Sequence, residues 1–246
     1  MAAEVSIDLP VPASVLAIGA HADDVEFGGG ATLAKWAERG ADVHLLVLTD
    51  GSKGTWEAGA SLPELVVERR REQEKAAAVL GIRDVSFLDL VDGELTSGRA
   101  EQGLVCAAIR SLRPELVMGH DPWQRYRLHP DHRHAGFLVT DAIVAARDPH
   151  FFPEQAMAPH RPARLLLFEA DTPDHFERAE SFLDTKVEAL LCHRSQWETT
   201  MDIDADAPDT DAQRDAFASR VIDEAATAGA PAGLTHAEAF KLIDDL

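Results

Sequence analysis

Two short clusters of histidine and acidic residues carry the most chemistry in this sequence, and they lie far apart along the chain. The first is Ala20-His21-Ala22-Asp23-Asp24, which follows an apolar run and precedes a helix-like stretch. The second is His129-Pro130-Asp131-His132. Each cluster alone supplies too few ligands for a metal centre that keeps open coordination positions. Together they supply three or more ligands with a carboxylate and an imidazole to spare, a set that is typical of metal-assisted hydrolysis.

The spacing within the clusters indicates which side chains could hold a metal. His21 and Asp24 are three residues apart on a strand-to-helix turn, so an imidazole nitrogen and a carboxylate oxygen can face one cation. A third ligand is expected from an imidazole of the second cluster. Asp23 is then free to move protons as a general base. The alternative for the paired acids is helix N-capping, and the alternative for the second cluster is a set of solvated loop histidines.

Three neighbouring features are expected to serve structure more than chemistry. His134 lies two residues beyond His132, so on a helix it points elsewhere, and we expect it at the surface. Gly28-Gly29-Gly30 resembles a phosphate-binding loop but lacks the Gly-x-Gly-x-x-Gly spacing and a Walker lysine, which favours close backbone packing. Asp50 follows an apolar run, where it could hydrogen-bond a substrate hydroxyl or form a turn.

Composition and charge narrow the class of function. The 246 residues are 46% hydrophobic, enough for a sizeable core, and 23 Lys and Arg against 43 Asp and Glu give a net charge of −20. Such a chain repels phosphate backbones and anionic membranes, so we expect no nucleic-acid partner and no membrane partner. The N-terminus lacks a basic segment followed by a long apolar core, which predicts a cytoplasmic protein.

The cysteines do not suggest a metal site of their own. Cys106 and Cys192 lie in helix-like apolar patterns and form no Cys-x-x-Cys motif. We therefore expect two buried free thiols.

Short apolar runs alternate with helical patterns along most of the chain. Continuous hydrophobicity in the runs indicates strands covered on both faces. Repeated strand–helix units predict an α/β fold: a Rossmann-like, doubly wound, mostly parallel sheet with helices on both faces. The expected strands are 15–19, 43–49, 85–88, 116–119 and 164–168. The expected helices between them are 32–39, 62–80, 101–112 and 132–147, with Gly40 and Gly81 after the first two as C-caps.

This fold prediction brings the two clusters together. In the common Rossmann-like order the first strand lies beside the fourth, where the winding reverses, and ligands bind beyond the carboxyl ends of the strands. The first cluster follows the first strand, and the second cluster follows the fourth strand after the loop 120–128. We therefore expect both clusters at one edge of the sheet.

The pattern after residue 172 is mainly helical. Helices are expected over 174–193 and 212–228, with an acidic loop over 202–211. Thr235-His-Ala-Glu238 before an apolar stretch is a capping-box pattern, which predicts a last helix. No Gly/Ser-rich linker interrupts the chain. We expect one domain over 1–246, with a core over about 13–200 and a helical C-terminal extension over 201–246.

On these residues the chain resembles the LmbE-like, or PIG-L, zinc-dependent N-deacetylases. The family motifs Ala-His-Pro-Asp-Asp and His-Pro-Asp-His match the two clusters, and the resemblance covers roughly residues 15–200. Further similar segments are Leu48-Thr-Asp50-Gly51, Arg69-x-x-Glu72 with Leu80-Gly81, Asp92-Gly-Glu-Leu95 and His193-Arg-Ser-Gln196. Ala22 replaces the family's proline, which leaves the ligand types and their spacing unchanged but removes a constraint on the turn.

The resemblance implies a role for each residue of the clusters. By this resemblance His21, Asp24 and His132 bind one Zn²⁺ per chain, and Asp23 is the general base. His129 stabilises the oxyanion or donates a proton, with Asp131 orienting it. Imidazole and carboxylate ligands do not select zinc strongly, so another divalent metal could take its place.

The implied activity is the hydrolysis of a linear amide. The family removes an acyl group, usually acetyl, from N-acylated amino sugars and related small-molecule glycoconjugates, and the metal activates the attacking water. The pocket is expected at the loops 53–56 and 123–127, which follow carboxyl ends of strands. Candidate substrate contacts are Asp50, Lys53, Trp56, Arg69, Asp92 and Trp123. The sequence does not set the oligomeric state, and a homo-oligomer is compatible with it.

Two other functions fit parts of the same pattern. A metal-dependent phosphoesterase would need more acidic ligands and basic groups for the phosphate, for which Arg125, Arg127 and Arg133 are available. A non-enzymatic, Mg²⁺-binding receiver-like module would use the paired acids with a phosphoacceptor such as Asp89. The absence of a lysine after the fifth strand and the histidines of the clusters argue against the receiver.

Overall fold

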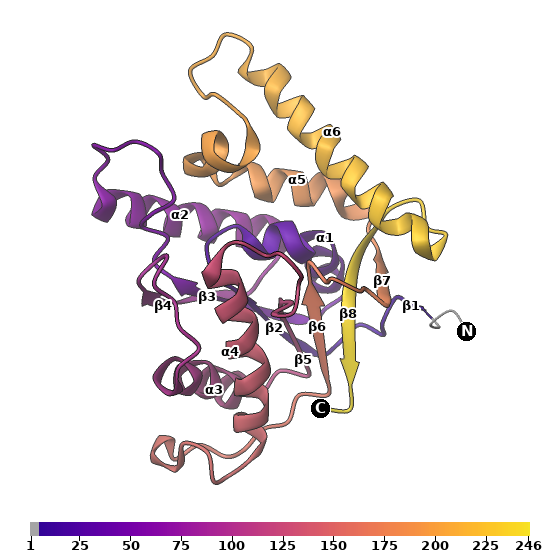
Figure 1. Cartoon of the computed structure of the whole chain (residues 1–246). Helices are drawn as coiled ribbons and strands as arrows, with labels where there is room; N and C mark the ends of the chain where they lie inside the picture. Colours follow the sequence, from indigo (N-terminus) through magenta and orange to yellow (C-terminus); the bar gives the residue numbers. More distant parts are fainter. Residues whose placement is uncertain (1–4) are drawn as a thin grey trace.

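The computed structural model describes residues 5–246, and within them eight strands form one sheet with helices on both faces (Figure 1). The strands are β1 (Ser6–Ile7), β2 (Ser14–Gly19), β3 (Asp42–Thr49), β4 (Asp84–Leu90), β5 (Leu116–His120), β6 (Arg164–Phe168), β7 (His175–Arg178) and β8 (Ala237–Asp244). Their order is β1-β7-β8-β6-β5-β2-β3-β4. Only β8 runs antiparallel to its neighbours among the described strands. β2 pairs with β5, which confirms the predicted switch point.

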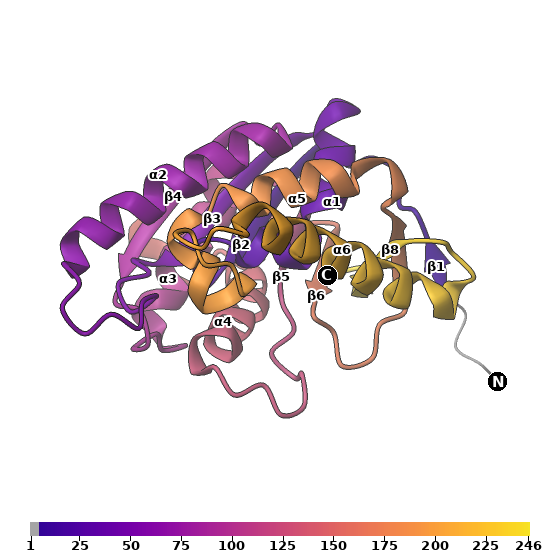
Figure 2. The same cartoon turned by 90° about the horizontal axis from the view of Figure 1, so that it is seen from above.

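The helices form a layer on each face of the sheet. They are α1 (Asp24–Glu38), α2 (Leu62–Leu80), α3 (Arg99–Leu112), α4 (Pro130–Arg147), α5 (Leu183–Leu191) and α6 (Thr210–Gly229). Short helical turns occupy Pro153–Gln155, Glu180–Phe182, Arg194–Gln196, Trp197–Met201 and Ala230–Ala232. α3 and α4 cover one face, α1, α2 and α5 cover the other, and α6 lies outside α5 (Figures 1 and 2). The doubly wound α/β prediction is therefore confirmed.

The central strand β2 shows why the apolar runs are continuous. Leu16 and Ile18 belong to the core under α3 and α4, whereas Val15 and Ala17 belong to the core under α1 and α2. All four side chains are fully buried. Burying a valine, leucine or isoleucine side chain, such as those of Val15, Leu16 and Ile18, stabilises the fold by about 1.5–3 kcal/mol. A strand between two such cores has no face on which a polar residue would be solvated.

Helix α1 begins at Asp24 and not at residue 32 as predicted, and it contains three consecutive glycines. The backbone leaves helical geometry at Gly29. A Cβ on Gly28 would collide with the ring of Phe168, and a Cβ on Gly29 would lie 2.7 Å from the sulfur of Met118. The glycines thus allow α1 to approach the sheet closely, as predicted. Their low helix propensity is the reason that the sequence pattern placed the helix start too late.

The C-terminal segment contains strands where helices were predicted. The helix expected over 174–193 is wrong in its first part, which forms β7, and it is correct only for α5. The helix expected after Thr235 is wrong, since residues 237–244 form β8 between β6 and β7. The helix expected over 212–228 is confirmed as α6, so the helical extension describes only part of 201–246.

Tertiary contacts explain why the capping-box pattern fails. The Glu238 carboxylate accepts hydrogen bonds from the backbone N–H groups of Ala31 (3.0 Å) and Thr32 (2.7 Å) and from Nζ of Lys186 (2.7 Å). These N–H groups follow the kink at Gly29 in α1. Phe240 is fully buried in the core. These long-range contacts outweigh the local signal, so the segment pairs with β6 and β7 as a strand. One domain over 1–246 stays a prediction.

Two further expectations concern thiols and membranes. Cys106 and Cys192 are both free, as predicted, but only Cys106 is buried and Cys192 is half-buried. Cys192 is partly exposed because it lies just after the end of α5. No helix within residues 5–246 is both long and apolar enough to span a bilayer.

Candidate active site

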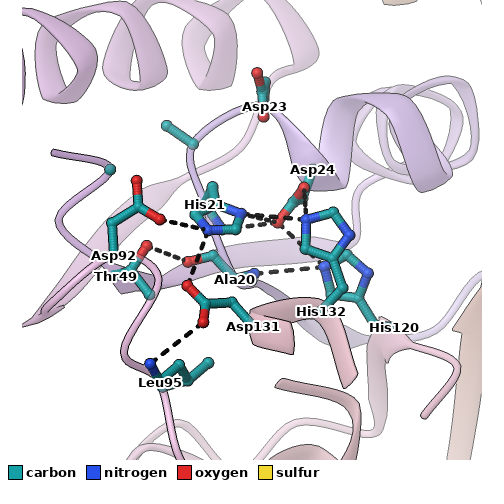
Figure 3. A network of polar contacts seen from close by, with 12 residues as sticks. Ala20, His21, Asp23, Asp24, Thr49, Asp92, Leu95, His120, Asp131 and His132 are labelled. Carbon is teal, nitrogen blue, oxygen red and sulfur yellow. Dashed lines mark hydrogen bonds and ion pairs between the residues drawn. The ribbon is translucent and has the colours of Figure 1, made fainter. Parts of the chain in front are cut away.

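The site lies at the carboxyl ends of β2 and β5, where the sheet order reverses. The turn after β2 carries His21, Asp23 and Asp24, and Asp24 is the first residue of α1. The loop after β5 leads to His129, which caps α4, so that His132 lies in the first turn of that helix. The loop after β4 adds Asp92. Figure 3 shows Asp24, Asp92 and His132 around His21, which lies at the centre of a network of polar contacts.

Four atoms of three residues from the two clusters lie close together, with each imidazole nitrogen facing a different oxygen of Asp24. Nδ1 of His21 lies 3.2 Å from Nε2 of His132 and 3.4 Å from Oδ2 of Asp24. Nε2 of His132 lies 3.2 Å from Oδ1 of Asp24. Ligand atoms bound at about 2.1 Å around a tetrahedral ion are about 3.4 Å apart. The residues present therefore fit a zinc-class ion.

The charges of two of the three proposed ligands, His132 and Asp24, also suit a cation. Burial lowers the pKa of His132 to about 3, against the attraction of the Asp24 carboxylate, so its imidazole is neutral. Burial alone would raise the pKa of Asp24, but His132 and His120 hold it well below its usual value. A neutral imidazole and an ionised carboxylate are the protonation states that bind metals.

The far side of His21 is held by two acids. Its Nε2 lies 3.1 Å from Oδ1 of Asp92 and 3.2 Å from Oδ2 of Asp131. Asp131 in turn accepts hydrogen bonds from the backbone N–H groups of Gly93 (2.6 Å) and Leu95 (3.2 Å). A metal-binding histidine usually donates its second N–H to a carboxylate, which fixes the tautomer. This arrangement leaves Nδ1 of His21 for the ion.

Asp131 therefore contacts a different imidazole from the one expected, and Asp92, expected as a substrate contact, joins it at His21. Among the described residues no hydrogen bond joins Asp131 to His129, which Asp131 was expected to orient. His129 is exposed, with its ring 4.7 Å from that of His21 and 4.8 Å from that of His132. His129 lines the same cavity as the ligands. Its expected role at the oxyanion stays a prediction.

Asp23 lies beside the ligands but makes different contacts. It is buried, lines the same cavity, and its carboxylate is set apart from the ligand cluster in Figure 3. Its backbone adopts a left-handed conformation (φ 92°), and its N–H donates to Oε1 of Gln73 (3.1 Å). Burial raises the pKa of Asp23 to about 6, even though Arg69 and His193 act to lower it. A carboxylate with such a pKa is suited to general acid–base catalysis near neutral pH.

The cavity over this cluster measures about 720 Å³. Of the six expected substrate contacts, the structure places Lys53, Trp56, Arg69 and Asp92 on its wall. Trp123 is not on that wall; it is 59% exposed, and its ring packs against Phe137 at 6.1 Å. Asp50 is also absent from the wall, because its Oδ1 accepts from the N–H groups of Ser52 (3.0 Å) and Asp92 (3.1 Å) within a turn.

Two of the wall residues already have protein partners. Arg69 is buried and donates to the carbonyls of Ala22 (2.9 Å) and Gly51 (3.1 Å). Oδ2 of Asp92 accepts from the N–H of Lys53 (2.9 Å). Both side chains therefore shape the loops around the ligands, whatever contact they also make with a substrate.

Sequence reasoning missed several residues of the site. His120 at the end of β5 contacts Asp24, and the cavity wall also includes Phe27, Glu169, Gln196, Thr199, Thr200 and Glu224. A histidine that directly ends a strand at the switch point was the available signal for His120. Phe27 lies three residues after Asp24 on α1, and Gln196 ends one of the segments that resemble the family. The remaining residues come from segments that only the tertiary fold brings near the cavity. His134, as predicted, lies away from the cluster, with Nδ1 3.2 Å from Oγ of Ser97.

The side chains needed for the other two functions already have protein partners, although Arg127 itself lies on the cavity wall. Arg127 pairs with Glu169, and Arg133 donates to backbone carbonyls of the loop before α4. Arg125 is exposed and lies 3.7 Å from Asp171. Asp89, the receiver's candidate phosphoacceptor, pairs with Arg70. These contacts favour neither a phosphate site nor a phosphoacceptor.

A second large cavity, of about 880 Å³, lies between α2 and the segment after α5. Its wall includes Val67, Leu191, Cys192 and Trp197 but none of the clustered histidines. The chemistry described above therefore belongs to the smaller cavity at the switch point.

A Rossmann-like sheet with a His/Asp cluster at its switch point defines a class of α/β proteins, and the cluster is a candidate metal site. Residues 16–143 match the model of the PIG-L family, which is described as GlcNAc-PI de-N-acetylase. The chain belongs to this family, as the resemblance of the two motifs predicted.

Relatives within the family differ in their named activities. Diacetylchitobiose deacetylase from Thermococcus kodakarensis is 37% identical over 186 residues, which cover 74% of this chain and 70% of that protein. The structure of N,N'-diacetylchitobiose deacetylase from Pyrococcus horikoshii matches with a TM-score of 0.84 at 27% identity, covering 95% of this chain and 84% of that one. A 4-oxalmesaconate hydratase from Pseudomonas putida is 28% identical over 199 residues, or 75% of this chain and 76% of that protein.

Proposed function

We propose that this protein is a zinc-dependent N-deacetylase that removes an acyl group, in the first place acetyl, from an N-acylated amino sugar or a related glycoconjugate. The observation that carries the proposal is the convergence of His21, Asp24 and His132 at 3.2–3.4 Å, with Asp23 beside them but outside the ligand set. The similarity to two diacetylchitobiose deacetylases supports the substrate class. Both proteins are named for an N-acetylated sugar.

In amide hydrolysis the proposed ligands hold the metal ion, and Asp23 transfers the protons. A bound zinc-class ion acts as a Lewis acid that polarises the amide carbonyl and lowers the pKa of water. The carboxylate of Asp23 accepts a proton from the attacking water. The same group then delivers that proton to the nitrogen of the leaving amine. Its pKa of about 6 lets the same group serve as base and as acid near neutral pH.

The exposed imidazole of His129 is assigned to the carbonyl oxygen. It lines the cavity next to both ligand histidines, where an N–H can donate to the oxygen on which negative charge develops. Such a donor stabilises the transition state more than the substrate, because the charge is larger there. Asp131 and Asp92 are assigned to His21 and hold its ring from behind.

The cavity suits a neutral, hydroxyl-rich substrate. Its wall offers both acceptors and donors, including Asp92, Glu169, Lys53 and the two threonines after Gln196. Trp56 is 74% exposed at the rim, where its flat ring can stack on a sugar. The volume of about 720 Å³ exceeds the space that one sugar ring fills, so a disaccharide or a conjugated sugar fits.

The test measures whether amide hydrolysis depends on the metal content of the protein. The purified protein, freed of metal and reloaded with Zn²⁺, is assayed for acetate release from N-acetylglucosamine and diacetylchitobiose. We expect activity to rise with zinc up to one ion per chain. Asp23→Asn should keep the metal and lose turnover by about 10²–10⁴-fold, whereas Asp141→Asn, an exposed change on α4, should behave as wild type.

Two results would contradict the proposal. A fully loaded protein that releases no acetate from any N-acetylated amino sugar would remove the assigned reaction. Full activity of Asp23→Asn would remove the assigned base while leaving the metal centre standing.

A further inference from the structure

His120 is a buried imidazole behind the proposed metal centre, and no role has yet been assigned to it. It is the last residue of β5 and is 2% exposed. Its ring stacks on that of His132, with centroids 4.4 Å apart, and lies edge-on to Phe168 at 4.5 Å. The ring is thus fixed in place by packing on two sides.

One ring nitrogen of His120 faces a proposed metal ligand. Nε2 lies 3.1 Å from Oδ2 of Asp24, and the same oxygen accepts a hydrogen bond from the backbone N–H of His21 at 2.7 Å. The other oxygen, Oδ1, faces Nε2 of His132 at 3.2 Å. Two donors on one oxygen prevent the carboxylate from rotating. The second oxygen is then kept toward the ligand histidines (Figure 3).

The opposite nitrogen of His120 faces a second acid. Nδ1 lies 3.2 Å from Oε2 of Glu169, which follows β6 in a left-handed conformation (φ 53°). The guanidinium of Arg127 pairs with that same Oε2 atom. A neutral imidazole has one N–H and can donate to only one of the two carboxylates. The backbone N–H of Ala20 also points at Nε2, but from 3.5 Å, whereas the Asp24 oxygen lies at 3.1 Å. Because Asp24 is the nearer partner and Arg127 already supplies Glu169 with a positive partner, we place the N–H of His120 on Nε2.

We infer that His120 is a positioning residue of the metal centre, whose Nε2–H holds Oδ2 of Asp24 so that the carboxylate is oriented for the ion. The inference rests on the proposed metal centre and adds to it a residue outside the two sequence motifs. Partners of this kind typically contribute 10–100-fold to metal affinity. The competing role is that of a fourth ligand, in which Nε2 itself would bind the metal.

The experiment compares substitutions that keep or remove a donor at the position of Nε2. The amide nitrogen of glutamine can take the place of Nε2, whereas that of asparagine corresponds to Nδ1. His120→Gln, His120→Asn and His120→Phe are therefore made in the full chain, with His134→Ala as a matched control on a histidine outside the site. The affinity of each protein for Zn²⁺ is measured by competition with a chromophoric chelator, and the visible absorption of the Co²⁺ forms is recorded.

We expect His120→Asn and His120→Phe to bind Zn²⁺ about 10–100-fold more weakly than wild type. His120→Gln and His134→Ala should bind it as wild type does. The Co²⁺ absorption should keep the same bands and intensity in every variant, because the set of ligands is unchanged. Thermal unfolding of the metal-free proteins checks folding, and the Asn and Gln variants suffice for the comparison if the Phe variant does not fold.

Several outcomes would overturn the inference. Wild-type affinity in both His120→Asn and His120→Phe would show that the contact to Asp24 has no effect on the metal. Equal loss in all three His120 variants, with altered Co²⁺ absorption, would identify a fourth ligand in place of a positioning residue. A wild-type chain that binds no divalent metal would overturn both this inference and the proposed function, whereas the first two outcomes leave the proposed function intact.

Discussion

The guanidinium of Arg69 lies 3.9 Å from the carboxylate of Asp23 and donates a 2.9 Å hydrogen bond to the carbonyl of Ala22, the preceding residue. One buried cation thus contacts both the backbone and the side chain of the turn that carries the proposed base. Asp23 itself has a left-handed backbone, which is strained for a residue with a side chain. Arg69 lies in α2 and belongs to the segment Arg69-x-x-Glu72, which resembles the family. Its side chain therefore stabilises this turn.

The first prediction concerns the pH dependence of activity. Burial raises the pKa of Asp23 to about 6, and the positive charge of Arg69 limits this rise. Removing the cation in Arg69→Ala should raise that pKa further, so Asp23 stays protonated and inactive as a base up to higher pH. The acidic limb of the kcat/KM profile should therefore move to higher pH. Arg69→Lys, which keeps the charge, should show a smaller shift, and an unmoved limb in Arg69→Ala would contradict the assignment.

The second prediction concerns competition between protons and the metal. Burial would lower the pKa of His21, but the carboxylates of Asp131, Asp24 and Asp92 raise it well above its usual value in the metal-free protein. Metal binding must then displace one proton from His21. The apparent affinity for Zn²⁺ should increase about tenfold per pH unit below that pKa and level off above it.

Titrations with Zn²⁺ at several pH values, in a buffer that does not bind zinc, measure this slope. Asp92→Asn removes one of the acids that raise the pKa of His21, so the slope should level off at a lower pH. His21→Ala and His132→Ala should abolish stoichiometric binding after dialysis against a chelator. An affinity that does not change with pH would show that His21 is not the group that loses the proton.

The third prediction separates transition-state stabilisation from metal binding. His129→Ala removes an exposed imidazole that contacts the ligand rings but is assigned to the carbonyl oxygen. We expect kcat to fall by about 10²-fold or more while the zinc content stays at the wild-type level. Steady-state kinetics and metal analysis on one preparation test this, and unchanged kinetics with intact metal would make His129 an ordinary loop residue.

The fourth prediction uses the two tryptophans of the pocket loops as a matched pair. Trp56 lines the cavity at its rim, whereas Trp123 packs against Phe137 and is absent from the wall. Trp56→Ala should raise KM several-fold with little change in kcat, because a stacking contact binds substrate and transition state alike. Trp123→Ala should leave KM unchanged. The reverse result would place the substrate against the loop 123–127.

Much of the fold could be read from local patterns, because burial on two faces leaves a direct trace in the sequence. Continuous apolar runs predicted the strands from β2 to β6, and Gly81 in a left-handed conformation ends α2 where the pattern indicated. The two motifs, together with the rule for the switch point, also predicted which histidines and acids would meet. Residue type and spacing were sufficient to predict which side chains lie close together, since each motif lies on one short turn.

The tertiary structure decided the features that depend on partners distant in sequence. Residues 237–244 carry a local helix signal, but Glu238 binds the kinked α1 and Phe240 fills the core, so the segment forms a strand. Asp131 contacts His21 and not the neighbouring His129, because the loop after β4 supplies the N–H groups that orient its carboxylate. His120 meets Asp24 only because β5 lies beside β2. A sequence pattern records which residues are available, but packing between distant segments determines which of them touch.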